Sequence, residues 1–119
     1  MHFRYLLCAT LLAFPTAAFA QAAPTYGSGM AVCSNLEQAD FDSSTRVGQW
    51  ILGYVSGGAA INIGLAAMAG DKSVADKIWK NGENNRISDL LARAWQHCQA
   101  HPNDKVYQSA LSALKNLTQ

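Results

Sequence analysis

The longest uncharged stretch within residues 21–119 runs from Val47 to Gly70 and contains the segment WILGYVSGGAAINIGL, Trp50–Leu65. Four short polar residues precede it and offer helix N-caps: Asp42, Ser43, Ser44 and Thr45. We therefore predict one long helix that ends near Met68. Because it is apolar on every side, we expect it to be a central helix enclosed by others. The glycine pair at 57–58 either kinks this helix or splits it in two.

One face of this helix combines glycines with large side chains: Trp50, Gly53, Tyr54, Gly57, Ile61, Gly64 and Met68. Glycine inside a helix costs about 1 kcal/mol relative to alanine, so these glycines need a compensating contact. We expect them to let a neighbouring helix approach closely, with Trp50 and Tyr54 filling the space beside it. On this interpretation Gly53→Leu costs about 1–3 kcal/mol through overpacking.

A membrane span is the main alternative for this segment, because its length suffices and small residues four apart also occur in membrane helices. Ser56 and Asn62 inside the segment, the glycines and the lack of a basic cluster beside either end argue against it. A phosphate-binding loop is disfavoured, because the glycine spacing is wrong and no strand precedes it.

Two short helices are predicted on either side of the long one. Ser34 and Glu37 fit a capping box for a first helix over Asn35–Asp40. Ser73 and Asp76 fit a second box for a helix through Trp79, which Gly82 can close.

Two longer amphipathic helices follow. The first has an apolar stripe with helical spacing and ends before His101-Pro102; the stripe is Ile87, Leu90, Leu91, Ala94, Trp95 and Cys98. The second is capped by Asn103 or Asp104 and turns five apolar residues inward: Val106, Ala110, Leu111, Leu114 and Leu117. Since no segment alternates like a strand, residues 33–119 predict an all-α bundle of four to five helices.

The first twenty residues have the pattern of a secretory signal peptide. His2 and Arg4 precede an apolar stretch, and Ala18-Phe19-Ala20 forms a small-x-small cleavage site before Gln21. We therefore predict export to the periplasm, with cleavage after residue 20 and a flexible leader over residues 21–32.

Cleavage would also remove Cys8 and leave two cysteines, Cys33 and Cys98. In an oxidising compartment such a pair most simply forms one disulfide, and two free buried thiols are the alternative. Closing this loop stabilises the fold by roughly 4 kcal/mol on the chain-entropy model.

The charge of residues 21–119 is balanced, with eight acidic and eight basic side chains. A neutral chain of this kind has no electrostatic footprint for nucleic acid or for an anionic membrane. We expect protein partners, no nucleic acid and no membrane insertion of the mature chain, and a homodimer is left open.

Candidate chemistry is sparse. His97 and His101 share a helical face beside Cys98, a spacing that can hold zinc or copper, but residues 21–119 contain no further histidine or cysteine to complete a site. A Cys98–His97 nucleophile lacks an orienting partner. We therefore expect no enzyme, no metal and no cofactor. Four aromatic residues could line a ligand pocket, although aromatics at helical spacing are more often core: Trp50, Tyr54, Trp79 and Trp95.

Three motifs together resemble a family: Cys33, the WILGYVSG segment at Trp50–Gly57, and HCQAHP at His97–Pro102 before a short apolar helix. They are similar to the HdeA/HdeB-type periplasmic proteins, small helical domains with one disulfide whose named members are acid-stress chaperones. The resemblance implies that Cys33 and Cys98 form the bridge. It also implies that apolar surface hidden at neutral pH is offered to clients in acid, with four candidate residues: Trp50, Ile51, Tyr54 and Val55. Compared with that family, this chain has an insertion from Asp71 to Asn85.

A second resemblance is weaker. Gly53-Tyr54 with Gly57, followed by His101-Pro102, is similar in outline to the immunity proteins that neutralise amidase toxins of type VI secretion, although the extra cysteines expected there are missing. We expect an acid-stress chaperone that prevents aggregation of periplasmic proteins, with a toxin-neutralising immunity protein as the alternative. A small-molecule or metal carrier is the third function class.

Overall fold

The computed structural model describes residues 27–119, which form four α-helices and three short 3-10 turns without a strand. The predicted signal peptide lies outside these residues. The helices are α1, Arg46–Met68; α2, Lys72–Asn84; α3, Ile87–Ala100; and α4, Val106–Thr118. The 3-10 turns are η2, Gly27–Met30; η3, Cys33–Asn35; and η4, Gln38–Asp40. The prediction of a small all-α domain is confirmed.

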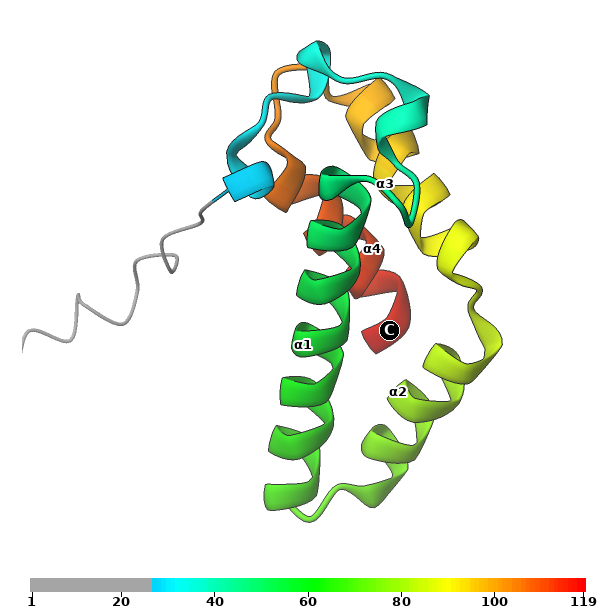
Figure 1. The fold of residues 1–119 in the computed structure, drawn as a ribbon. Coiled ribbons are helices and arrows are strands. Elements are labelled where there is room, and N and C mark those ends of the chain that lie inside the picture. The colour runs from blue at the N-terminus through cyan, green and yellow to red at the C-terminus, as the bar shows by residue number, and fades with distance from the viewer. Residues whose placement is uncertain (1–26) are drawn as a thin grey trace, which may run out of the picture.

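The helices are arranged as a long hairpin with a smaller pair beside one end of it. Figure 1 shows α1 descending to a tight turn, α2 returning from that turn, and α3 and α4 lying beside the upper part of α1. The turn uses Gly70 with a positive φ of 74°, a conformation that glycine adopts without strain. The free end of the hairpin therefore projects away from α3.

The core lies where α1, α3 and α4 meet. Its largest fully buried side chains include Ile51 and Val55 of α1 and Val106 of α4, and Ala94, Ala110 and Ala113 are buried completely among them. Small residues at these positions let the three helices approach closely. Two residues of the predicted inward stripes are instead exposed: Ile87 at the first position of α3 (56%) and Leu111 of α4 (36%).

The first predicted helix is wrong. Residues 35–40 form parts of two 3-10 turns with extended backbone at Leu36 and Glu37 between them. Tertiary hydrogen bonds anchor the two residues before this segment, because Cys33 N–H donates to Asp104 O (2.8 Å) and Ser34 N–H donates to Pro102 O (2.8 Å). These bonds hold the chain immediately before residue 35 in a non-helical path, so the local helix propensity of residues 35–40 is overridden.

Two predicted helix starts are also wrong. Asp71, not Ser73, caps α2, because its carboxylate accepts a hydrogen bond from Val74 N–H (3.2 Å). Asp76 pairs instead with Lys72 (2.5 Å). At α4 the N-cap position is Lys105, whose N–H donates to the side chain of Gln108 (2.8 Å).

The end of α2 also differs from its prediction. The helix passes Gly82 and ends at Asn84, because Asn85 Nδ2 donates to Asn81 O (2.6 Å) and closes the last turn. Asn81 Nδ2 in turn donates to Leu117 O (2.9 Å) at the end of α4. This contact between distant helices extends α2 beyond the glycine.

The long helix is confirmed as one continuous element with Thr45 as N-cap, but its predicted enclosure is wrong over its second half. Val47, Ile51 and Val55 are buried, whereas Ile61, Leu65 and Met68 are 64%, 59% and 86% exposed. The reason is length: α4 is ten residues shorter than α1 and covers only its first half.

The predicted close approach at the glycine face is wrong as well. A Cβ added at Gly53, Gly57 or Gly64 would meet no atom within 4 Å. The close contacts occur at other glycines: a Cβ at Gly58 would collide with the Leu114 side chain, and one at Gly48 with the carbonyl of Asp42.

Residues 27–32, which the sequence assigns to the leader, pack against α1 and α4. Val32 forms an antiparallel bridge with Lys105, and Val106 N–H donates to Ala31 O (2.9 Å). Gly29 is buried there. This segment closes the end of the domain that lies opposite the hairpin turn.

Candidate functional site

The most unusual surface of the described chain is apolar and lies on the free half of the α1–α2 hairpin. We call it the hairpin surface and define it by five exposed residues: Ile61, Leu65, Met68, Val74 and Trp79. The helix that supplies the first three carries no charge after Arg46. By helical spacing Ile61, Leu65 and Met68 share one face of α1, while Trp79 of α2 borders the groove on another side. Single exposed apolar residues are ordinary, but five on one projecting element make it a candidate interaction surface.

A groove lies between the two helices of the hairpin. It has a volume of about 450 Å³ and is lined by eight residues of α1 and α2: Ser56, Ala59, Ala60, Ile63, Ile78, Trp79, Gly82 and Glu83. Trp79 contributes to both the groove and the hairpin surface, and its indole N–H donates to Glu83 Oε1 (3.0 Å). This bond fixes the ring beside the groove. An apolar side chain from another molecule can therefore pack between the helices next to a positioned indole.

The four site residues suggested by the family resemblance lie at the other end of α1. Ile51 and Val55 belong to the core, with 0% and 2% exposure. Trp50 and Tyr54 are partly buried and stack on each other, with ring centroids 5.3 Å apart. These four residues therefore lie in or against the folded core, and the five residues of the hairpin surface lie elsewhere. A signal in the sequence could have found the hairpin surface. The uncharged run from Val47 to Gly70 has 24 residues, and a partner helix of 13 residues such as α4 is too short to cover all of it.

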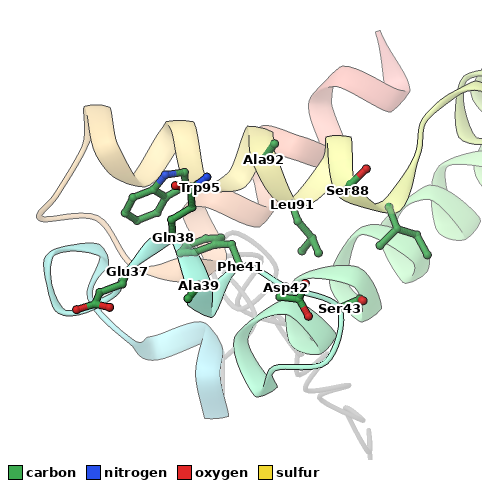
Figure 2. Close-up of a pocket in the computed structure, with 11 residues that line it drawn as sticks. Glu37, Gln38, Ala39, Phe41, Asp42, Ser43, Ser88, Leu91, Ala92 and Trp95 are labelled. Carbon is green, nitrogen blue, oxygen red and sulfur yellow. The ribbon is translucent and has the colours of Figure 1, made fainter.

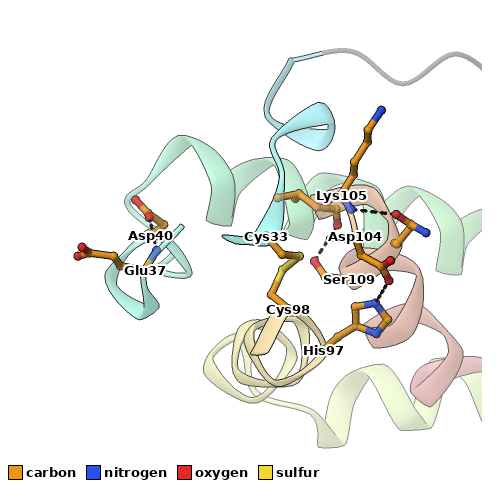
Figure 3. Close-up of a disulfide and its surroundings, with 10 residues drawn as sticks. Cys33, Glu37, Asp40, His97, Cys98, Asp104, Lys105 and Ser109 are labelled. Atoms are coloured by element: carbon orange, nitrogen blue, oxygen red, sulfur yellow. Dashed lines mark hydrogen bonds and ion pairs between the residues drawn. A yellow bond between two sulfur atoms is a disulfide. The ribbon is translucent and has the colours of Figure 1, made fainter. Parts of the chain in front are cut away.

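Cys33 and Cys98 form a disulfide that joins η3 to the buried face of α3, as predicted. Figure 3 shows His97 beside this bridge with its ring directed to Asp104, and His97 Nε2 lies 2.8 Å from Asp104 Oδ2. The His101 ring packs on that of His97 at a centroid distance of 4.5 Å. Because Asp104 O also accepts the Cys33 N–H, these contacts hold the loop between α3 and α4 against the bridge.

In the part of the chain that the structure describes, no three His, Cys, Asp or Glu side chains are grouped so that they could hold a metal ion. Cys98 is in the disulfide, so its sulfur is not a free nucleophile. The four aromatic residues considered for one pocket are separated: Trp50 stacks on Tyr54, Trp95 packs against Phe41, and Trp79 lies on the hairpin.

Two carboxylates hold the turns at the two ends of α1. Ser44 Oγ and Ser44 N–H donate to Asp42 Oδ1 (2.6 and 2.9 Å), and these bonds lower the pKa of Asp42 below its ordinary value. At the other end the hydroxyl of Ser73 and then the N–H of Val74 lower the pKa of Asp71 in the same way. Both turns are therefore most stable when these carboxylates are ionised.

By length and composition α1 also meets the requirements of a membrane span, and only 11% of its most apolar 18-residue window is buried. No family model, curated protein or solved structure matches the chain.

Proposed function

We propose that this protein is an exported, acid-responsive chaperone that binds non-native proteins through the hairpin surface. The observation that carries the proposal is the exposure of Ile61, Leu65, Met68 and Trp79 on one projecting element. Burying one such side chain stabilises a complex by about 1.5–3 kcal/mol, and the interaction needs no specific sequence in the client. A surface of this kind fits unfolded segments of many proteins.

Acid would act on the hairpin through its turn. The pKa of Asp71 is lowered in the folded state, so the stability that this carboxylate contributes is present above its unfolded pKa. It is lost as the pH falls through the folded pKa. The N-cap of α2 is then weakened, which favours opening of this helix and exposure of the buried Ile78. The apolar area offered to a client therefore grows as the solution becomes acidic.

The charge of the chain supports the same proposal. In acid the carboxylates are neutral, while the eight bases and two histidines of residues 21–119 are positive. Ten positive charges on a small protein keep it, and a complex that contains it, soluble through mutual repulsion. The disulfide and the α1–α3–α4 core limit how far the chain expands.

The test is suppression of client aggregation, followed by light scattering at pH 2–3 and at pH 7. The wild-type protein should suppress aggregation in acid, and Leu65→Ser with Met68→Ser should weaken client binding by more than about tenfold. Leu111→Ser is the matched control, because Leu111 is an exposed leucine on α4 outside the hairpin surface. A protein that suppresses nothing at acidic pH, or whose suppression survives the double substitution, contradicts the proposal.

Neutralisation of a toxin is the second candidate, and the shape of the hairpin favours it. A projecting element with an apolar end can enter the cleft of a folded enzyme, as inhibitors commonly do. Such a partner would bind tightly at neutral pH, and Leu65→Ser would abolish that binding. The remaining alternative is that α1 spans a membrane, and flotation with lipid vesicles tests it. If α1 binds proteins instead, the protein should stay in the soluble fraction.

A further inference from the structure

A second groove lies at the end of the molecule away from the hairpin turn, between α3 and the segment that precedes α1. Its volume is about 810 Å³, within the range of small-molecule and peptide pockets. Figure 2 shows the two walls facing each other, with Leu91, Ala92 and Trp95 on α3 and residues 37–43 opposite. None of its lining residues belongs to the hairpin surface.

The floor of this groove is apolar and fixed. Phe41 and Leu91 are buried, and the Trp95 ring packs on Phe41 with centroids 5.2 Å apart. From Ser88 to Trp95 the α3 wall spans seven residue steps, about 10 Å along the helix at 1.5 Å per residue. An extended peptide covers this length with about three residues at 3.3 Å each.

The charge of the lining has one sign. Among its eleven residues Glu37 and Asp42 are acidic and none is basic. Neither carboxylate forms an ion pair within residues 27–119, and the neighbouring Arg46 and Arg86 lie outside the lining. Figure 2 places Glu37 toward the Trp95 end and Asp42 toward the Ser88 end. The groove therefore combines an apolar floor with negative charge at both ends.

From this arrangement we propose that the groove binds an extended peptide segment in which apolar residues lie between two basic side chains. The apolar side chains would contact Phe41, Leu91 and Trp95, and the two cations would lie beside Glu37 and Asp42. This site is separate from the hairpin surface. Because its two carboxylates flank an apolar floor, it would recognise a peptide segment of defined sequence, whereas the hairpin surface would recognise apolar side chains of any sequence.

The experiment uses the full disulfide-bonded protein and two capped peptides, acetyl-Arg-Leu-Phe-Arg-amide and acetyl-Glu-Leu-Phe-Glu-amide, in titration calorimetry. The basic peptide should bind and the acidic peptide should not. Glu37→Gln and Asp42→Asn should each weaken binding by about two- to fivefold, as expected for exposed ion pairs. Ala92→Trp should block the groove, whereas the matched Gln96→Trp, also at an exposed position of α3 but outside the lining, should leave binding unchanged.

Three results would overturn the proposal. They are equal binding of both peptides, binding that survives Ala92→Trp, and competition by the simple dication putrescine as effective as by the basic peptide. The last result would show that the apolar floor contributes nothing. Leu65→Ser with Met68→Ser should not affect peptide binding, so failure here and failure of the chaperone proposal are distinguishable.

Discussion

Glycines in one helix have opposite roles in this protein, and the difference is set by single contacts. At Gly48 a Cβ would collide with the backbone carbonyl of Asp42, which cannot move without opening the turn that Thr45 caps. At Gly57 a Cβ would meet nothing within 4 Å. The sequence alone suggested Gly53, Gly57 and Gly64 as the close contacts, because helical spacing identifies a face but not what covers it.

We expect Gly48→Ala to destabilise the protein by about 1–3 kcal/mol through overpacking. Gly57→Ala should instead stabilise it by about 0.5–1 kcal/mol, since alanine lowers the entropy cost of the helix. Urea unfolding of both variants beside the wild type measures the two effects. Equal destabilisation by both substitutions would contradict the geometry described for α1.

A second residue-scale prediction concerns Asp71. Its folded pKa is lowered by Ser73 and by Val74 N–H, so stability falls as the pH drops through the folded pKa. Asp71→Asn keeps a capping oxygen but removes the charge. The variant should lose less stability than the wild type between about pH 5 and pH 2, where an aspartate titrates. Thermal unfolding across this range measures it, and identical pH profiles would refute the assignment.

At the scale of elements, α2 is held differently from the other helices. Ile78 is its only buried residue and stands apart from the core cluster that joins α1, α3 and α4. The Asn81–Leu117 hydrogen bond is its polar connection to α4. Few buried contacts predict that α2 opens at a lower free energy than the rest of the domain.

Ile78→Ala should therefore release α2 without unfolding the core. Removing a buried isoleucine side chain costs about 2–5 kcal/mol. Amide hydrogen exchange should speed up across α2 while α3 and α4 keep their protection. Val74→Ala, at an exposed position of the same helix, serves as the control. If protection falls equally in every helix, α2 is part of one cooperative unit and this picture is wrong.

The sequence predicted the elements better than it predicted their surroundings. The end of α1 near Met68 and the stop of α3 before Pro102 follow from local signals, and both were confirmed. The segment around Glu37 and the extension of α2 past Gly82 depend on Pro102 and Leu117, which are distant in sequence. Local capping patterns contain no information on such partners.

At the scale of the whole molecule, the disulfide was predictable because only two cysteines remain after residue 20. The hairpin surface was not predictable in the same way. Because α1 is apolar on every side, it suggests burial along its whole length until its length is compared with that of the helices that pack on it. The groove with Glu37 and Asp42 also depends on tertiary arrangement, because its two walls are separated by α1 and α2 in sequence.

The bridge spans 65 residues in sequence, and closing such a loop stabilises a fold by about 4 kcal/mol on the chain-entropy model. Replacing Cys33 and Cys98 together by alanine should lower the free energy of unfolding by up to this amount. It should also raise the pH at which the protein unfolds in acid. Thermal and acid unfolding of the double variant measure both changes. Unaltered midpoints would show that the core alone fixes the fold.

The bridge has a further consequence for what a protease can do to this protein. The hairpin turn around Gly70 lies between Cys33 and Cys98, so a cut after the exposed Lys72 would sever the backbone without separating the pieces. The nicked chain would keep its mass apart from one added water, and both fragments would keep their places in the core. The projecting end of α1 would lose its covalent link to α2, while the Cys33–Cys98 bridge still joined the two pieces.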